Sequence, residues 1–188
     1  QLAAQDNMWI VQPSTPANHF HMLRTQAYKR PRKPLIAFTP KQLLRLSAAS
    51  SHIEEFTSGG FQPVIGDTTI TDPASVTRVL LCSGRLYYDL AKEREHRGDT
   101  SSAIIRLEQL YPLPEAELAE VLAQYPNASV TWVQDEPRNQ GAWPHLALNL
   151  FPSLGRPVRV VSRPESATTA AGRASLHKEQ AATLIAQA

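Results

Sequence analysis

The stretch Val79–Gly98, VLLCSGRLYYDLAKEREHRG, contains the two signals that decide the fold. It begins with four apolar residues, Val79–Cys82, which predict a strand buried on both faces. A Ser-Gly turn pair follows, and apolar residues then recur at a helical spacing, at Leu86 and Leu90. Gly98 is a typical residue at a helix C-terminus. The stretch therefore predicts a strand followed by a helix, the unit from which parallel sheets are built.

The same alternation continues to the end of the chain. Apolar runs at 103–107, 130–133 and 158–161 predict three further strands. Helices are predicted between and after these strands. The first has the apolar residues Leu118, Val121, Leu122 and Tyr125, the second begins near Pro144, and the last has Leu176, Leu184 and Ile185. Four strands alternating with four helices predict an α/β fold of three layers, α/β/α, with a mostly parallel sheet. Ligands of such sheets bind beyond the carboxyl ends of the strands.

The first 50 residues predict a smaller unit of strand, helix, strand and helix. Short apolar runs at 8–11 and 35–38 are each followed by a Thr-Pro pair, at Thr15 and at Thr39. Threonine is a good N-cap, and proline is favoured at the first helical position. From residue 48 to about 72 the chain is rich in Ser, Thr and Gly. We therefore expect residues 1–50 to end one domain, residues 51–75 to link, and residues 76–188 to form another.

Composition excludes several classes of protein. Hydrophobic residues make up 42% of the 188 residues, which excludes a disordered tail. No apolar run approaches the roughly 18 residues of a membrane helix, so we expect no membrane partner. The single cysteine, Cys82, cannot form an internal disulfide, which favours a reducing, cytoplasmic setting. The chain begins at Gln1 without a leader pattern, and we expect it to be a piece of a longer protein.

Charge is distributed unevenly along the chain. Residues 1–50 have seven basic residues and one acidic residue, a net charge of +6, whereas the remainder has a net charge of −4. A basic front attracts anions, and a helix N-terminus after a strand offers free N–H groups to them. The candidate anion-binding residues are Arg24, Thr39, Lys41, Arg45, Ser83 and Arg85. Ordinary helix capping by the hydroxyl groups remains the alternative.

The remaining motifs give no catalytic, cofactor-binding or metal site. The glycine pattern of dinucleotide sites, the nucleophile elbow and the phosphate-loop lysine do not occur in the sequence. His19 and His21 lie two residues apart and face different directions on a helix, unlike metal ligands. Asp135 and Glu136 could act as acid and base, but capping a helix or forming a docking surface is favoured. Cys82 is interpreted as packing within a strand.

Seven motifs in order carry a family resemblance. They are Asn7-Met8, Pro13–Ala17, Phe20–Arg24, Phe38–Lys41, Cys82–Asp89, Arg106–Pro112 and Asp135–Pro137 with Asn139–Trp143. Together they resemble the C-terminal end of the thiamine-diphosphate-dependent 2-oxoglutarate dehydrogenases, the decarboxylating component of that complex. The resemblance covers nearly the whole chain. The amino-acid sequence around Asp135 is similar to that of the actinobacterial, multifunctional form.

The resemblance implies that the cofactor site and the catalytic residues lie outside this segment. Thiamine diphosphate and Mg²⁺ would be bound upstream of Gln1, as would the catalytic histidines, and no residue here matches them. Residues 1–50 would end the pyrimidine-binding domain, and the rest would be a transketolase-type C-terminal domain. Its sheet would be mixed and five-stranded, with Gln62–Ile65 as its first, edge strand.

The resemblance also implies partners and regulation. The parent enzyme would be a homodimer of the citric acid cycle that passes a succinyl group to a lipoyl-bearing succinyltransferase. This segment would support the dimer and help to form an allosteric site for acetyl-CoA or a nucleotide. Two alternatives stay open: a segment of a related 2-oxoacid dehydrogenase, such as one for 2-oxoadipate, and a non-catalytic anion- or nucleotide-binding module. No nucleic-acid partner is expected.

The isolated 188-residue chain should neither bind thiamine diphosphate nor decarboxylate 2-oxoglutarate, because its sequence has no pattern for the cofactor. Isothermal titration with thiamine diphosphate and Mg²⁺ measures this directly. Micromolar binding by the isolated chain would show that the cofactor site has been assigned to the wrong part of the protein.

Overall fold

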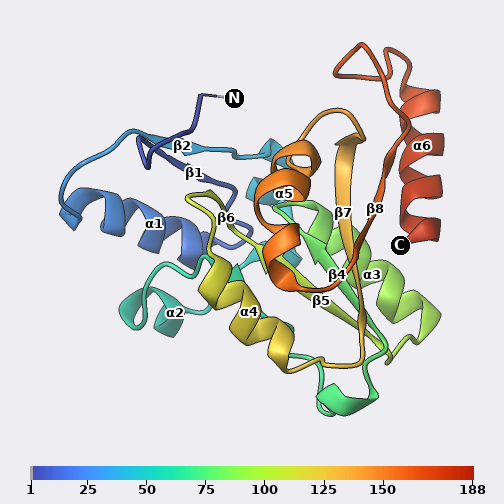
Figure 1. The fold of residues 1–188 in the computed structure, drawn as a ribbon, viewed down its shortest axis with the longest axis horizontal. Helices are drawn as coiled ribbons and strands as arrows, with labels where there is room; N and C mark the ends of the chain where they lie inside the picture. The colour runs from blue at the N-terminus through green and yellow to red at the C-terminus, as the bar shows by residue number, and fades with distance from the viewer. Residues whose placement is uncertain (1) are drawn as a thin grey trace.

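A computed structural model describes residues 2–188 and contains one large and one small sheet (Figure 1). The large sheet has the order β3-β5-β4-β7-β8. Its strands are β3 (Val64–Ile65), β4 (Arg78–Cys82), β5 (Ser102–Leu107), β7 (Ser129–Pro137) and β8 (Val158–Arg163). The last four are parallel, and β3 pairs antiparallel with β5. The mostly parallel sheet and its edge strand near residues 62–65 are therefore confirmed.

Helices cover both faces of this sheet. On one face lie α3 (Leu86–Arg97) and α6 (Ala174–Gln187), and Figure 1 shows α6 beside β8 at the right of the view. On the other face lie α4 (Glu115–Ala123) and α5 (Trp143–Asn149), followed by a 3₁₀ helix at Phe151–Leu154. This confirms the three-layer arrangement.

The apolar run of β4 is explained by this double cover. Val79 and Leu81 pack on the α4 and α5 side, whereas Leu80 and Cys82 pack on the α3 and α6 side. Successive side chains of a strand point to opposite faces, so a strand buried on both sides must be apolar at every position.

The small sheet joins the front of the chain to the rest. It has the order β2-β1-β6, with β1 (Trp9–Val11) parallel to β2 (Leu35–Ala37) and antiparallel to β6 (Gln109–Tyr111). Helix α1 (Pro16–Tyr28) follows β1 and begins as predicted, because the Thr15 hydroxyl accepts a hydrogen bond from the Asn18 N–H at 3.1 Å. The short helix α2 (Ile53–Thr57) packs against α1.

The second predicted helix of the front unit is wrong in kind. Residues Lys41–Arg45 and Ser47–Ala49 form two 3₁₀ turns, and the N-cap position is Pro40, which makes no side-chain bond, rather than Thr39. Leu44 is 86% exposed, so the segment has no apolar face to bury. Without tertiary packing a short helix in water is marginal.

Two strands and one helix residue also differ from the prediction. Strand β7 continues through Pro137, so the acidic pair lies at the end of a strand rather than in a loop. The three-residue β6 was missed, because it is defined by pairing with β1 across the chain rather than by a local pattern. Leu176 of α6 is 39% exposed, whereas Leu184 is buried as expected.

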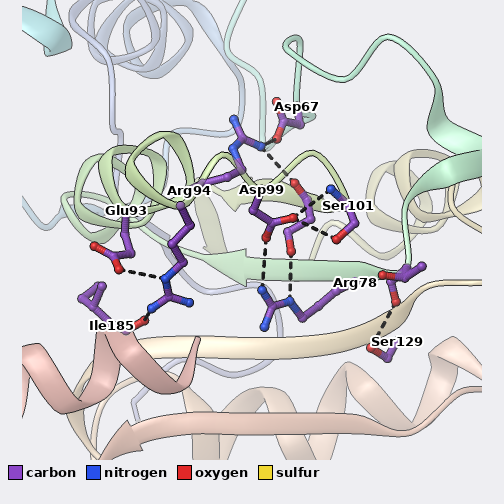
Figure 2. A network of polar contacts seen from close by, with 11 residues as sticks. Asp67, Arg78, Glu93, Arg94, Asp99, Ser101, Ser129 and Ile185 are labelled. Carbon is purple, nitrogen blue, oxygen red and sulfur yellow. Dashed lines mark hydrogen bonds and ion pairs between the residues drawn. The ribbon is translucent and has the colours of Figure 1, made fainter.

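A polar network ties the connections of the large sheet together (Figure 2). The Asp67 side chain, 1% exposed, pairs with Arg94 of α3 and accepts a hydrogen bond from the Ile104 N–H at 2.8 Å. Burial alone would raise the pKa of Asp67, but hydrogen bonds from Thr69, Ile104 and Arg94 together lower it. Asp67 therefore holds the segment after β3 against both α3 and β5.

The same network extends along β4 and α3. Arg78 donates to Ser102 at 3.0 Å and pairs with Asp99 at 3.3 Å. Arg97 pairs with Glu93 at 2.8 Å and donates to the Ile185 carbonyl at 3.1 Å. Arg78 therefore joins β4 to β5 and to the turn after α3, and Arg97 joins α3 to α6.

Replacing Asp67 by Ala should lower the free energy of unfolding of the chain by about 3–5 kcal/mol, because Arg94 would be left buried without its partner. Urea denaturation at pH 7 measures this loss. Since the pKa of Asp67 is lowered in the fold, its stabilisation exists above the ordinary pKa of an aspartate. It is lost as the pH falls through the lowered value, so the two proteins should converge in acid. Glu117→Ala, at an exposed position, is the control, and an equal effect of both changes would contradict the prediction.

Candidate effector cavity

A cavity of about 910 Å³ lies where the small sheet meets the carboxyl ends of β4 and β7. Its walls come from the N-terminal segment before β1, from β1 and β6, from the turn after β4, from the end of β7 and from α5. Parallel sheets bind their ligands at this edge. The position agrees with the place where the sequence predicted functional loops.

The turn after β4 is shaped by the close approach of the Gln12 side chain to the backbone of Gly84. Gly84 has φ +58°, and a Cβ atom there would lie 2.6 Å from the side-chain nitrogen of Gln12. Only glycine fits this position. The Ser83 hydroxyl donates to the Leu107 carbonyl at 2.5 Å, so the turn is bound to β5 as well as to the front segment.

Four charged side chains form a chain beside this turn. Arg85 pairs with Asp89 one helical turn away and with Asp135 of β7 at 3.1 Å, and Arg163 of β8 pairs with Asp135 at 2.6 Å. Burial would raise the pKa of Asp135, but the bond and charge of Arg163 and the charge of Arg85 lower it. The two arginines therefore hold Asp135 ionised.

Gln134, buried beside Asp135, fixes the backbone that follows β7. Its Oε1 accepts from the Trp132 indole N–H at 3.0 Å and from the Trp143 N–H at 2.9 Å. Its Nε2 donates to the carbonyl oxygens of Pro137 and Gln140, at 3.0 and 2.8 Å. One neutral amide thus uses both its oxygen and its NH₂ group to set the rim of the cavity.

The side chains of Asp135 and Glu136, at the end of β7, are arranged for a structural role rather than for catalysis. Asp135 faces two arginines and is not positioned to take up a proton, whereas Glu136 is exposed to solvent. The geometry agrees with the favoured structural interpretation rather than with paired acid and base.

The structure brings only some of the six candidate anion-binding residues to this cavity. Ser83 and Arg85 line it, and so do Phe38 and Pro40, the neighbours of Thr39. The other candidates do not line it: Thr39, Lys41 and Arg45 are exposed, and Arg24 donates to the Gly59 carbonyl at 2.6 Å.

The histidines of α1 are not arranged as metal ligands. His21 is buried and its Nε2 lies 2.7 Å from the Glu55 carbonyl oxygen of α2, so it serves to pack the two helices. Among residues 2–188, no group of three or more carboxylate, imidazole or thiol side chains converges in a way that could hold a metal ion.

Sequence reasoning missed the most buried polar cluster, around Glu108. The Glu108 side chain is 0% exposed, and it contacts Ser14 and Asn18 at the start of α1. Arg106, two residues before it, donates to the Ser14 hydroxyl at 3.1 Å. The available signal was two charged residues at alternate positions, 106 and 108, directly after the apolar run Ala103–Ile105.

The fold defines a transketolase C-terminal-like α/β domain, joined at the carboxyl ends of its strands to the small sheet. Residues 50–188 match the family described as 2-oxoglutarate dehydrogenase C-terminal. The chain belongs to this family. In the part of the chain that the structure describes, no helix is long and apolar enough to span a membrane.

Three relatives are similar over nearly all of the chain. The 2-oxoglutarate dehydrogenase E1/E2 component of Corynebacterium glutamicum is 47% identical over 100% of the chain and 16% of the relative. The 2-oxoadipate dehydrogenase complex component E1 of Xenopus laevis is 46% identical over 93% of the chain and 19% of the relative. The multifunctional 2-oxoglutarate metabolism enzyme of Mycolicibacterium vanbaalenii is 42% identical over 100% of the chain and 16% of the relative. The chain therefore spans less than a fifth of each of these relatives.

Proposed function

We propose that the polypeptide to which this chain belongs carries out the oxidative decarboxylation of 2-oxoglutarate and transfers the succinyl group to a lipoyl-bearing succinyltransferase. The observation that carries this proposal is the match of residues 50–188 to the C-terminal family, with 47% identity to a 2-oxoglutarate dehydrogenase component along the whole chain. The single cysteine, buried in β4, is compatible with the cytoplasmic setting that we propose for it.

Thiamine diphosphate would supply the carbanion-stabilising chemistry that side chains lack. The residues of this chain do not fit its diphosphate and Mg²⁺. No group of carboxylate, imidazole or thiol side chains that could hold Mg²⁺ occurs among residues 2–188. We therefore place the thiamine site elsewhere in the polypeptide and derive no step of the reaction from the residues described here.

For this segment we propose a supporting and regulatory role. Residues 1–50 would end the pyrimidine-binding domain, residues 51–75 would link, and residues 76–188 would be the C-terminal domain of a homodimer. The cavity between them would take an anionic effector, acetyl-CoA or an adenine nucleotide. Its volume, the Ser83 hydroxyl and the Arg85 guanidinium in its wall, and the net positive charge of residues 1–50 support this proposal.

A 2-oxoadipate dehydrogenase is the second candidate, because the Xenopus laevis relative is nearly as similar as the Corynebacterium glutamicum one. The two substrates differ by one methylene group, and the residues that distinguish them would lie outside this segment. The third candidate is a non-catalytic anion-binding module.

In the full-length protein, kcat/KM for 2-oxoglutarate should exceed that for 2-oxoadipate by about 10-fold or more, because one methylene group in a fitted pocket is worth about 10- to 200-fold. Ferricyanide reduction with each substrate, in the presence of thiamine diphosphate and Mg²⁺, measures both values. A reversed preference would favour the 2-oxoadipate enzyme, and no turnover of either substrate would favour the non-catalytic module.

Replacing Arg85 by Ala in the full-length enzyme should weaken activation by acetyl-CoA, because Arg85 lines the cavity, whereas Arg24 and Lys41 do not. Loss of one charged hydrogen bond costs about 1.5–3 kcal/mol, which is about 10- to 150-fold in affinity. The activation constant is measured from initial rates at increasing acetyl-CoA. Lys178→Ala on α6 is the matched control, since Lys178 is exposed and does not line the cavity. An unchanged activation constant in Arg85→Ala would mean that the Arg85 guanidinium does not bind the effector.

A further inference from the structure

Glu108 lies completely buried between the end of β5 and the start of α1. Its Oε2 accepts hydrogen bonds from the Ser14 N–H at 2.7 Å and from Asn18 Nδ2 at 3.0 Å. Its Oε1 is also buried and has no hydrogen-bond partner among residues 2–188. One oxygen therefore holds the beginning of α1 in place, while the other is enclosed in the protein.

The residues around Glu108 hold the same segment of the front unit. The Glu108 carbonyl accepts from the Gln12 N–H at 2.7 Å. Arg106 donates to the Ser14 hydroxyl at 3.1 Å, and the Tyr88 hydroxyl of α3 donates to the Ser14 carbonyl at 2.7 Å. Residues 12–18 are thus attached to the large sheet through one small, buried joint.

We propose that Glu108 is a pH-sensitive latch, which fixes residues 12–18 to the large sheet when its carboxyl group is neutral and loosens them when the group ionises. A neutral carboxyl keeps both hydrogen bonds, because Oε2 alone accepts them and the proton resides on Oε1. An ionised carboxylate at this fully buried position is separated from water and is costly to maintain. Opening the joint returns the charge to solvent.

Opposing electrostatic effects act on this carboxyl group. Burial raises the pKa of Glu108, whereas the hydrogen bonds from Asn18 and Ser14 and the charge of Arg106 lower it, and burial prevails. The positive end of the α1 helix dipole also favours the ionised form of Glu108. Because the Glu108 side chain is 0% exposed, the cost of burying its charge still prevails. The closed joint therefore favours the protonated, neutral form of Glu108.

The other ionisable groups that face Glu108 do not titrate in the same range. Burial raises the pKa of Cys82 on β4 to about 12 and that of Tyr88 on α3 to about 12. Residues 12–18 have no ionisable side chain. Glu108 is thus the group in this joint whose raised pKa makes its charge sensitive to a rise in pH above the ordinary glutamate range.

The direction of the pH effect follows from the raised pKa. The closed joint binds the proton more tightly than the open one, so closure is fully favoured below the ordinary glutamate pKa of about 4.3. Between that value and the raised one, each pH unit multiplies the open fraction by up to about 10. Closure is lost as the pH rises through the raised value.

Hydrogen–deuterium exchange of the full-length protein between about pH 5 and 8, corrected for intrinsic exchange, tests the latch. The protection of a peptide covering residues 12–18 should fall with rising pH, by up to about 10-fold per unit. In Glu108→Gln, whose amide oxygen can accept both hydrogen bonds, the protection should stay high and independent of pH. Glu115→Gln, at an exposed position of α4, should behave as the wild type.

Either of two outcomes would overturn the latch: a flat wild-type profile at residues 12–18, or the same slope in Glu108→Gln as in the wild type. If the variant does not fold, the wild-type profile still decides, because residues 129–134 of β7 should show no such slope. The measurement follows exchange rather than turnover, so its result is independent of the reaction that the enzyme catalyses.

Discussion

The burial of β4, β5 and β7 on both faces is the constraint from which the rest of the architecture follows. In β4, alternate residues pack against α4 and α5 on one side and against α3 and α6 on the other. Parallel strands need a crossover between them, and here the crossovers supply those covering helices. With both faces closed, the carboxyl ends of the strands are left for binding, and the turn after β4 and the end of β7 meet there to form the cavity.

Two buried carboxyl groups at this sheet show how the surroundings decide the state of a group. Asp67 pairs with Arg94 and accepts hydrogen bonds from Thr69 and Ile104, so its pKa is lowered. Glu108 accepts bonds from two neutral donors through a single oxygen, and its pKa is raised. The first carboxylate is a permanent structural tie within the domain. The second lies at the junction with the front unit, where a change of charge can alter how the parts are joined.

The large sheet could be predicted from the sequence because apolar runs such as Val79–Cys82 and helical stripes are local signals, and the Thr15 cap is local as well. The start at Thr39 failed, because exposed residues such as Leu44 give no packing to a helix. Strand β6 exists through its partner β1, 98 or more residues earlier, which no local pattern records. The cavity followed from the strand ends, and Ser83 and Arg85 line it. The Glu108 joint did not follow, since contact between Glu108 and Ser14 depends on the tertiary fold.

The joint and the cavity share a wall. Gln12 lines the cavity and packs against Gly84 in the turn that carries Ser83, and its backbone N–H is bound to the Glu108 carbonyl. A ligand that contacts Gln12 in the closed arrangement would therefore favour closure and, with it, the neutral form of Glu108. Coupling of this kind is reciprocal, so ionisation of Glu108 would weaken such a ligand by the same factor by which the ligand hinders ionisation. The cavity and the latch would then act as one device, in which the proton and a ligand of the cavity favour the same closed state.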